Sequence, residues 1–150
     1  MLKTAILHPQ ILAGLGRMGH SSKILIADGN YPFATKKHPA AEVVHLNFSP
    51  GMLKVTEVLG PMLDMIPIEL VEVMEPMKTG PYAMKEEPAI FGEFRKILAA
   101  KGYKKLELTK VERFDFYEAA AGKDVALVIA TGEGRIYANI LLTVGVVRGE

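Results

Sequence analysis

Residues 124–144 read DVALVIATGEGRIYANILLTV, two apolar segments joined by a glycine-containing turn. Asp124–Ala130 is almost wholly apolar, which is typical of a strand buried on both faces of a sheet. Thr131–Gly134 indicates a tight turn, and Ile136–Val144 predicts the final strand. A strand in which apolar and polar residues do not alternate must be buried on both faces of the sheet. This stretch therefore favours an α/β sandwich with helices on both sheet faces.

The upstream sequence alternates between short apolar segments and amphipathic ones. Further strands are predicted over Lys23–Ala27, Glu42–Leu46, Ile68–Met74 and Lys105–Thr109. Helices are predicted over 9–18, 50–66 with a break or kink at Pro61, 86–101 and Arg113–Ala121, with loops over 28–41 and 75–85. We find no repeat, linker or low-complexity segment, so we expect one domain over residues 1–150.

The composition excludes several classes of protein. The 18 Lys and Arg residues balance 17 Asp and Glu residues, so no clustered positive charge suggests a nucleic-acid partner. The chain has no cysteine, which excludes disulfides, thiolate metal sites and a cysteine nucleophile. No apolar run approaches the roughly 20 residues of a membrane span, and His8-Pro9-Gln10 interrupts the apolar start before it reaches signal-peptide length. We therefore expect a folded cytoplasmic protein without a membrane partner.

The sequence contains no familiar cofactor or metal motif in the structural context that the motif requires. Gly14–Gly19 spells G-x-G-x-x-G, but it ends a predicted helix instead of joining a strand to a helix, as dinucleotide binding requires. The turn at Thr131–Arg135 lacks the lysine and hydroxyl residue that end a phosphate-binding loop. The four histidines are widely spaced and form no metal-binding pattern. We therefore expect neither a cofactor nor a metal.

Polar residues follow several of the predicted strands. Asp28 comes directly after Lys23–Ala27, Arg113 follows the strand that starts at Lys105, and Thr131 and Glu133 follow Asp124–Ala130. Ligands of open α/β sheets bind outside the carboxyl ends of the strands. These side chains are therefore the first candidates for a binding site.

Three segments together carry a resemblance to a known family. They are Met18-Gly19-His20 with Asp28 eight residues after the histidine, RFDFYE from Arg113, and TGE from Thr131 followed by YAN at Tyr137–Asn139. With the opening MLKT and the HPQ at 8–10, this pattern resembles the ribose pyranase / fucose mutarotase (RbsD/FucU) family along the whole chain. DGNYP and RFDFYE are similar to the fucose branch, whereas Ala138 is the residue of the ribose branch.

The resemblance implies a fold, an activity and a set of site residues. The family fold is a three-layer α/β sandwich with a mostly parallel, Rossmann-like sheet. The implied activity is mutarotation of a free aldose, with L-fucose or a related sugar preferred, by general acid–base catalysis. His20 would be the catalytic acid/base, and the sugar would be held by Asp28, Arg113, Tyr137, Ala138 and Asn139. Family members form ring-like homo-oligomers, often decamers, with the site near a subunit interface.

The residue types suit this chemistry, although each has a simpler explanation by itself. Histidine can give and take protons near neutral pH, and Asp, Arg and Asn can fix sugar hydroxyls. Taken alone, His20 could be a residue at a helix end and Asp28 a turn residue. Two other functions stay open, namely a sugar-binding or transport-accessory protein without catalysis and an assembly scaffold.

Overall fold

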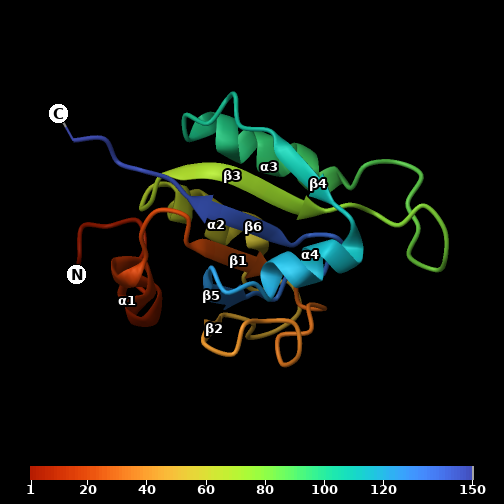
Figure 1. Ribbon diagram of the computed structural model, residues 1–150, viewed down its shortest axis with the longest axis horizontal. Coiled ribbons are helices and arrows are strands. Elements are labelled where there is room, and N and C mark those ends of the chain that lie inside the picture. Colours follow the sequence, from red (N-terminus) through yellow and green to blue (C-terminus); the bar gives the residue numbers. More distant parts are fainter. Residues whose placement is uncertain (150) are drawn as a thin grey trace.

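The computed structural model describes residues 1–149, which form one six-stranded sheet and four helices (Figure 1). The sheet order is β2-β5-β1-β6-β3-β4. The strands are β1 (Lys23–Ala27), β2 (Glu42–His45), β3 (Ile68–Met74), β4 (Leu108–Val111), β5 (Val125–Ala130) and β6 (Ile140–Val144). The helices are α1 (Pro9–Arg17), α2 (Val55–Leu63), α3 (Ala89–Ala100) and α4 (Arg113–Ala120).

The sheet is mostly parallel, as predicted. β5 pairs in parallel with β1 and β2, and β3 pairs in parallel with β4. Among the strands of residues 1–149, only β6 runs the other way, antiparallel to both β1 and β3. The start of β6 therefore lies at the same edge as the carboxyl ends of the other strands, which brings the segment before Ile140 next to the segment after Ala27.

Helices cover both faces of the sheet and complete the three layers. β1 shows the division, because Ile24 and Ile26 join the core under α1, α2 and α3, whereas Leu25 and Ala27 join the core under α4. This alternation follows from the two-residue period of a strand. In Figure 1, α4 lies in front of the sheet and α2 behind it. The α/β sandwich expected from the apolar strands is therefore confirmed.

Two strand boundaries differ from the prediction. The strand predicted over Lys105–Thr109 begins only at Leu108 and ends at Val111. Gly102 adopts a left-handed φ of +92° after α3, and the N–H of Leu106 donates to the carbonyl of Tyr103, so a turn occupies the preceding residues. The final strand begins at Ile140 instead of Ile136, since Tyr137 adopts a left-handed φ of +59° that no strand residue has.

Two helices are shorter than the sequence pattern suggested. α2 starts at Val55, because residues 49–53 instead bond to the turn after β5. Pro61 lies inside α2 without ending it. The proline stands near the carboxyl end, where it removes only one helical hydrogen bond and the chain stops at Leu63. α3 begins after Pro88, which has extended backbone angles. No helix among residues 1–149 has the length and apolar character needed to span a membrane.

Candidate active site

An open cavity of about 390 Å³ lies at the carboxyl edge of the sheet. Loops after β1 and β3, the start of α4 and the segment before β6 form its walls. Four of the residues predicted to hold a sugar, Asp28, Arg113, Tyr137 and Asn139, lie together in it. The complete lining is Asp28, Asn30, Tyr31, Met74, Tyr82, Arg113, Tyr117, Ile136, Tyr137 and Asn139.

Asp28 and Asn139 are joined by two hydrogen bonds at this cavity. The Asp28 N–H donates to the Asn139 Oδ1 atom at 2.8 Å, and the Asn139 Nδ2 atom donates to the Asp28 carboxylate at 3.0 Å. The Asn30 N–H donates to the other carboxylate oxygen at 3.0 Å. Asp28 is only 2% exposed. Because each polar group of the pair has a partner, the carboxylate is held in one orientation.

Burial changes the ionisation of this carboxylate. Desolvation raises the pKa of Asp28 from 3.8 to about 6, against opposing hydrogen bonds from Asn30, Ala138 and Asn139, and the charge of Glu133 adds to the rise. An aspartate with a pKa of about 6 exchanges its proton near neutral pH. That property fits a group that exchanges hydrogen bonds or protons with a ligand hydroxyl.

Tyr137 and Ala138 contribute in different ways. The Tyr137 hydroxyl accepts from the Met77 N–H at 3.0 Å and donates to the Tyr82 carbonyl at 2.8 Å, so it holds the loop between β3 and α3 over the cavity. Ala138 is fully buried in the core on the other side of the sheet. Its contribution is a backbone hydrogen bond to Asp28, and its side chain does not line the cavity.

Arg113 provides the positive charge at the cavity wall. It is the first residue of α4, whose start is capped by the Glu112 carboxylate through the N–H groups of the next turn. The guanidinium lies 5.8 Å from the ring centre of Tyr117, and its Nη1 atom contacts the Met77 sulfur at 3.3 Å. No carboxylate within residues 1–149 forms a salt bridge with it, so its fork of donors can bind a ligand oxygen.

His20 does not join this cavity within one chain. It precedes β1, whereas Asp28 follows β1, and a five-residue strand alone spans on the order of 16 Å. Its Nε2 atom lies 3.1 Å from both carboxylate oxygens of Glu69, near the start of β3. The imidazole is 55% exposed at this opposite edge of the sheet. A single chain therefore brings together four of the five predicted sugar-holding residues, all but Ala138, but not the predicted acid/base.

The turn Thr131–Gly134 lies beside the cavity and not in it. With Asn30 and residues 47–50, it lines a neighbouring hollow of about 380 Å³. Gly132 is required here, because a Cβ atom at this position would lie 2.0 Å from the Met52 carbonyl oxygen and 2.4 Å from that of Ser49. The segment is thus a structural junction, and the expectation that Thr131 and Glu133 belong to the binding site is not met in the main cavity, because both residues lie beside it.

Sequence reasoning missed several residues of the site. Tyr31 and Tyr117 stand inside segments that carried the family resemblance, yet neither was singled out. Their rings lie 5.8 Å apart between centres and form an apolar wall. Tyr82 lies in a loop with no regular pattern, so no sequence signal pointed to it. Glu69, the partner of His20, is hidden among the alternating residues of β3. Within the described part of the chain, no cluster of acidic or histidine residues could hold a metal ion.

Comparison with known proteins identifies the family of this chain. The human (Homo sapiens) fucose mutarotase is 31% identical over 147 residues, covering 95% of this chain and 90% of that protein. The structure of the Streptococcus pneumoniae fucose mutarotase in complex with L-fucose matches with a TM-score of 0.82 and 28% identity, over 99% of this chain and 100% of that one. Bacillus subtilis RbsD complexed with D-ribose matches with a TM-score of 0.75 and 25% identity, over 99% and 100%. The model of the RbsD / FucU transport protein family matches residues 1–147, and the chain therefore belongs to that family.

Proposed function

We propose that this chain is a monosaccharide mutarotase that interconverts the anomers, and the ring forms, of a free aldose. The observation that carries the proposal is the buried Asp28, fixed by Asn139 in the lining of a cavity whose other polar residues are hydrogen-bonding groups. The similar structures hold L-fucose and D-ribose. L-fucose is the first candidate substrate, because RFDFYE with Arg113 resembles the fucose branch.

The reaction needs only proton transfers. A base removes the proton from the anomeric hydroxyl while an acid protonates the ring oxygen, so the ring C–O bond breaks and a carbonyl forms. Rotation about the adjacent bond and the reverse transfers close the ring on the other face, with no net change in protons or electrons. Each well-placed acid or base contributes about 10²–10⁴-fold. Asp28, Arg113 and Asn139 would hold the hydroxyls, and Tyr137 and the Ala138 backbone would hold the cavity in shape.

His20 would supply the acid/base from an adjoining protomer. Its imidazole is exposed and oriented by Glu69, which suits a group that enters a cavity on a second copy of the chain. This arrangement fits the ring-like homo-oligomer, with ten subunits expected, that the family resemblance implies. One chain of residues 1–150 would form a single mutarotase domain and work in the cytoplasm.

Mixing two inactive variants tests the shared site. We expect His20→Ala and Asp28→Asn each to lose exchange activity alone. After they are denatured together and refolded, about a quarter of the interfaces in randomly mixed rings would carry an intact His20 and an intact Asp28. Activity should therefore return to about a quarter of the wild-type value. Failure to regain any activity in verified mixed oligomers would contradict the shared site.

A panel of free sugars separates the enzyme from a sugar-binding protein without catalysis. Saturation-transfer NMR on L-fucose, D-ribose and L-rhamnose measures the exchange between anomers with and without the protein. A mutarotase accelerates exchange of at least one sugar at micromolar concentration. A protein that shifts the NMR signals of its own cavity residues on adding sugar, but accelerates no exchange, would be the non-catalytic alternative.

A further inference from the structure

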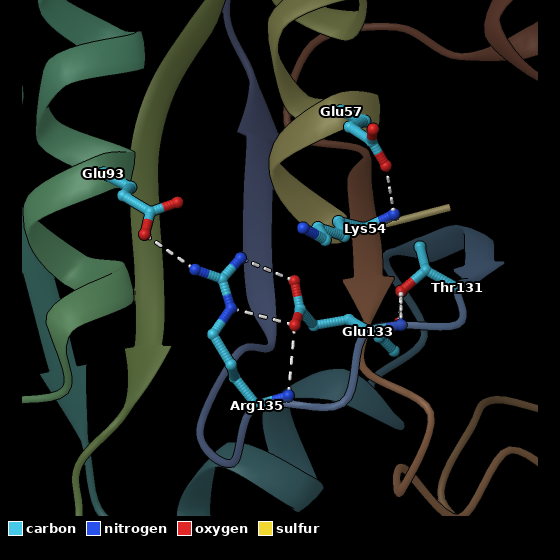
Figure 2. A network of polar contacts seen from close by, with 7 residues as sticks. Lys54, Glu57, Glu93, Thr131, Glu133 and Arg135 are labelled. Atoms are coloured by element: carbon cyan, nitrogen blue, oxygen red, sulfur yellow. Dashed lines mark hydrogen bonds and ion pairs between the residues drawn. The ribbon is translucent and has the colours of Figure 1, made fainter. Parts of the chain in front are cut away.

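Glu133 is a buried carboxylate that the proposed reaction does not use. It is only 2% exposed, yet its carboxylate is fully engaged (Figure 2). The Arg135 side chain donates from Nε to Oε1 at 2.9 Å and from Nη2 to Oε2 at 2.8 Å, and the Arg135 N–H donates to Oε1 at 3.1 Å. This is the two-pronged geometry in which arginine binds a carboxylate most strongly.

The ion pair also joins helices that come from distant parts of the sequence. The Arg135 Nη1 atom donates to Glu93 of α3 at 2.7 Å, as Figure 2 shows. The N–H of Val55, the first residue of α2, donates to the Glu133 carboxylate. A negative charge at a helix start is favourable there. Glu133 and Arg135 therefore connect α2 and α3 to the end of β5.

The same turn bonds to the backbone on both sides of Asp28. The Thr131 hydroxyl donates to the Ala27 carbonyl at 2.8 Å and accepts from the Glu133 N–H at 3.2 Å. The Gly29 N–H donates to the Glu133 carbonyl at 2.8 Å. Asp28 thus lies between two residues that are both held by the Thr131–Glu133 turn.

From these contacts we propose that Glu133 and Arg135 act as a positioning ion pair for Asp28, which fixes its loop and balances the charge beside it. The inference rests on the proposed function, because Asp28 matters only if the cavity is the site. Neither residue is expected to touch the sugar, so their role is exerted through Asp28.

The charge balance follows from the groups that face Asp28. Tyr31, Tyr82, Arg113, Tyr117 and Tyr137 share its cavity, and Glu133 stands behind its loop. The negative charge of Glu133 raises the pKa of Asp28. Burial raises the pKa of Glu133 itself, but the hydrogen bonds and charge of Arg135 and the Val55 N–H outweigh burial, and the pKa lies below its ordinary value. Glu133 is therefore ionised, and Arg135 offsets its field.

Two substitutions should move the titration of Asp28 in opposite directions. Glu133→Gln removes the negative charge, so the Asp28 midpoint should fall by about half a pH unit or more. Arg135→Gln leaves that charge unbalanced, so the midpoint should rise by about as much. Arg135→Lys keeps the charge and should restore the midpoint. If the ion pair only held the loop in place, Glu133→Gln and Arg135→Gln would not shift the Asp28 midpoint in opposite directions, and Arg135→Lys would not restore it.

The measurement is the pH titration of the Asp28 carboxyl carbon by NMR in the whole protein, alongside the pH profile of sugar exchange. Lys101→Gln removes one positive charge at the carboxyl end of α3 and is the control for net charge. If Arg135→Gln fails to fold, the Asp28 midpoint of Glu133→Gln is the deciding measurement. In that variant Arg135 keeps its hydrogen bond to Glu93, so the protein is expected to stay folded. Unchanged Asp28 midpoints, or shifts in the same direction, would overturn the inference. An absence of sugar exchange in the wild type would instead remove the proposed function, because the NMR titration does not depend on activity.

Discussion

Asn139 directs both ends of its side-chain amide at one residue, Asp28, accepting from its N–H at 2.8 Å and donating to its carboxylate at 3.0 Å. The two residues are 111 positions apart in the sequence and meet because β6 runs antiparallel to β1. The relationship fixes the carboxylate on which the proposed chemistry depends.

Replacing Asn139 by Asp should reverse this contact. The donor becomes an acceptor, and two buried carboxylates would face each other. We expect a loss of about 1–3 kcal/mol in the free energy of unfolding at pH 7.5, partly regained at pH 4.5 when the pair takes up a proton. Urea unfolding at both pH values measures it. Asn47→Asp makes the same change on an exposed residue, and an equal loss there would show that the pair is not responsible.

Asp28 should make stability depend on pH in an unusual direction. Its folded pKa of about 6 lies above the ordinary value of 3.8, so between these values the folded protein binds more protons than the unfolded chain. The free energy of unfolding contributed by Asp28 therefore falls as pH rises from about 4 to about 6, by at most about 3 kcal/mol.

The Asp28→Asn variant should lack this decline. Relative to wild type, it should gain stability as the pH rises through the same window, while losing sugar exchange. Unfolding curves at several pH values measure the difference, and Asp124→Asn, on an exposed residue, controls for the change of residue type. A constant difference between Asp28→Asn and wild type across pH 4–7 would show that the aspartate is not protonated in the folded protein near pH 5.

Gly132 offers a sharp test of the turn beside the site. The Cβ atom of alanine would lie 2.0 Å from the Met52 carbonyl oxygen, so the loop of residues 49–53 would have to move. We expect Gly132→Ala to destabilise the fold by about 1–3 kcal/mol or more. Gly134→Ala, two residues away with no atom within 4 Å of its Cβ, is the matched control and should change stability little. Similar thermal unfolding of both variants would contradict the close approach.

The Tyr137 hydroxyl should hold the loop between β3 and α3. Tyr137→Phe removes the acceptor of the Met77 N–H and the donor to the Tyr82 carbonyl. Amide hydrogen exchange at Met77 should then become faster by about fivefold, since a hydrogen bond contributes about 1 kcal/mol. Tyr103→Phe removes a comparable bond to the Ile68 N–H at the other edge of the sheet and should leave Met77 unchanged. Equal exchange at Met77 in wild type and Tyr137→Phe would exclude this role.

The sequence predicted the sandwich because the strands of residues 124–144 are apolar on both faces, a pattern that leaves few other folds. It also placed Asp28 correctly, since a polar residue after a buried strand lies at the carboxyl edge of the sheet. Register and direction are not visible in such patterns. The antiparallel β6, the late start of β4 and the left-handed Tyr137 depend on contacts between distant segments. His20 is a different case, because it precedes β1 whereas Asp28 follows it, so the sequence order already puts the two residues at opposite edges of the sheet. The family resemblance grouped them in one site, and a second chain would be needed to bring them together.

The central claim is that this cavity catalyses ring opening of a sugar. Saturation-transfer NMR between the two pyranose anomers of L-fucose tests it most directly, with wild type and Asp28→Asn at equal concentration. We predict that wild type transfers saturation between the anomeric protons at micromolar protein, and that Asp28→Asn reduces the exchange rate by about 10²-fold or more. Exchange at the uncatalysed rate with wild type, or full activity of a folded Asp28→Asn variant, would contradict the claim.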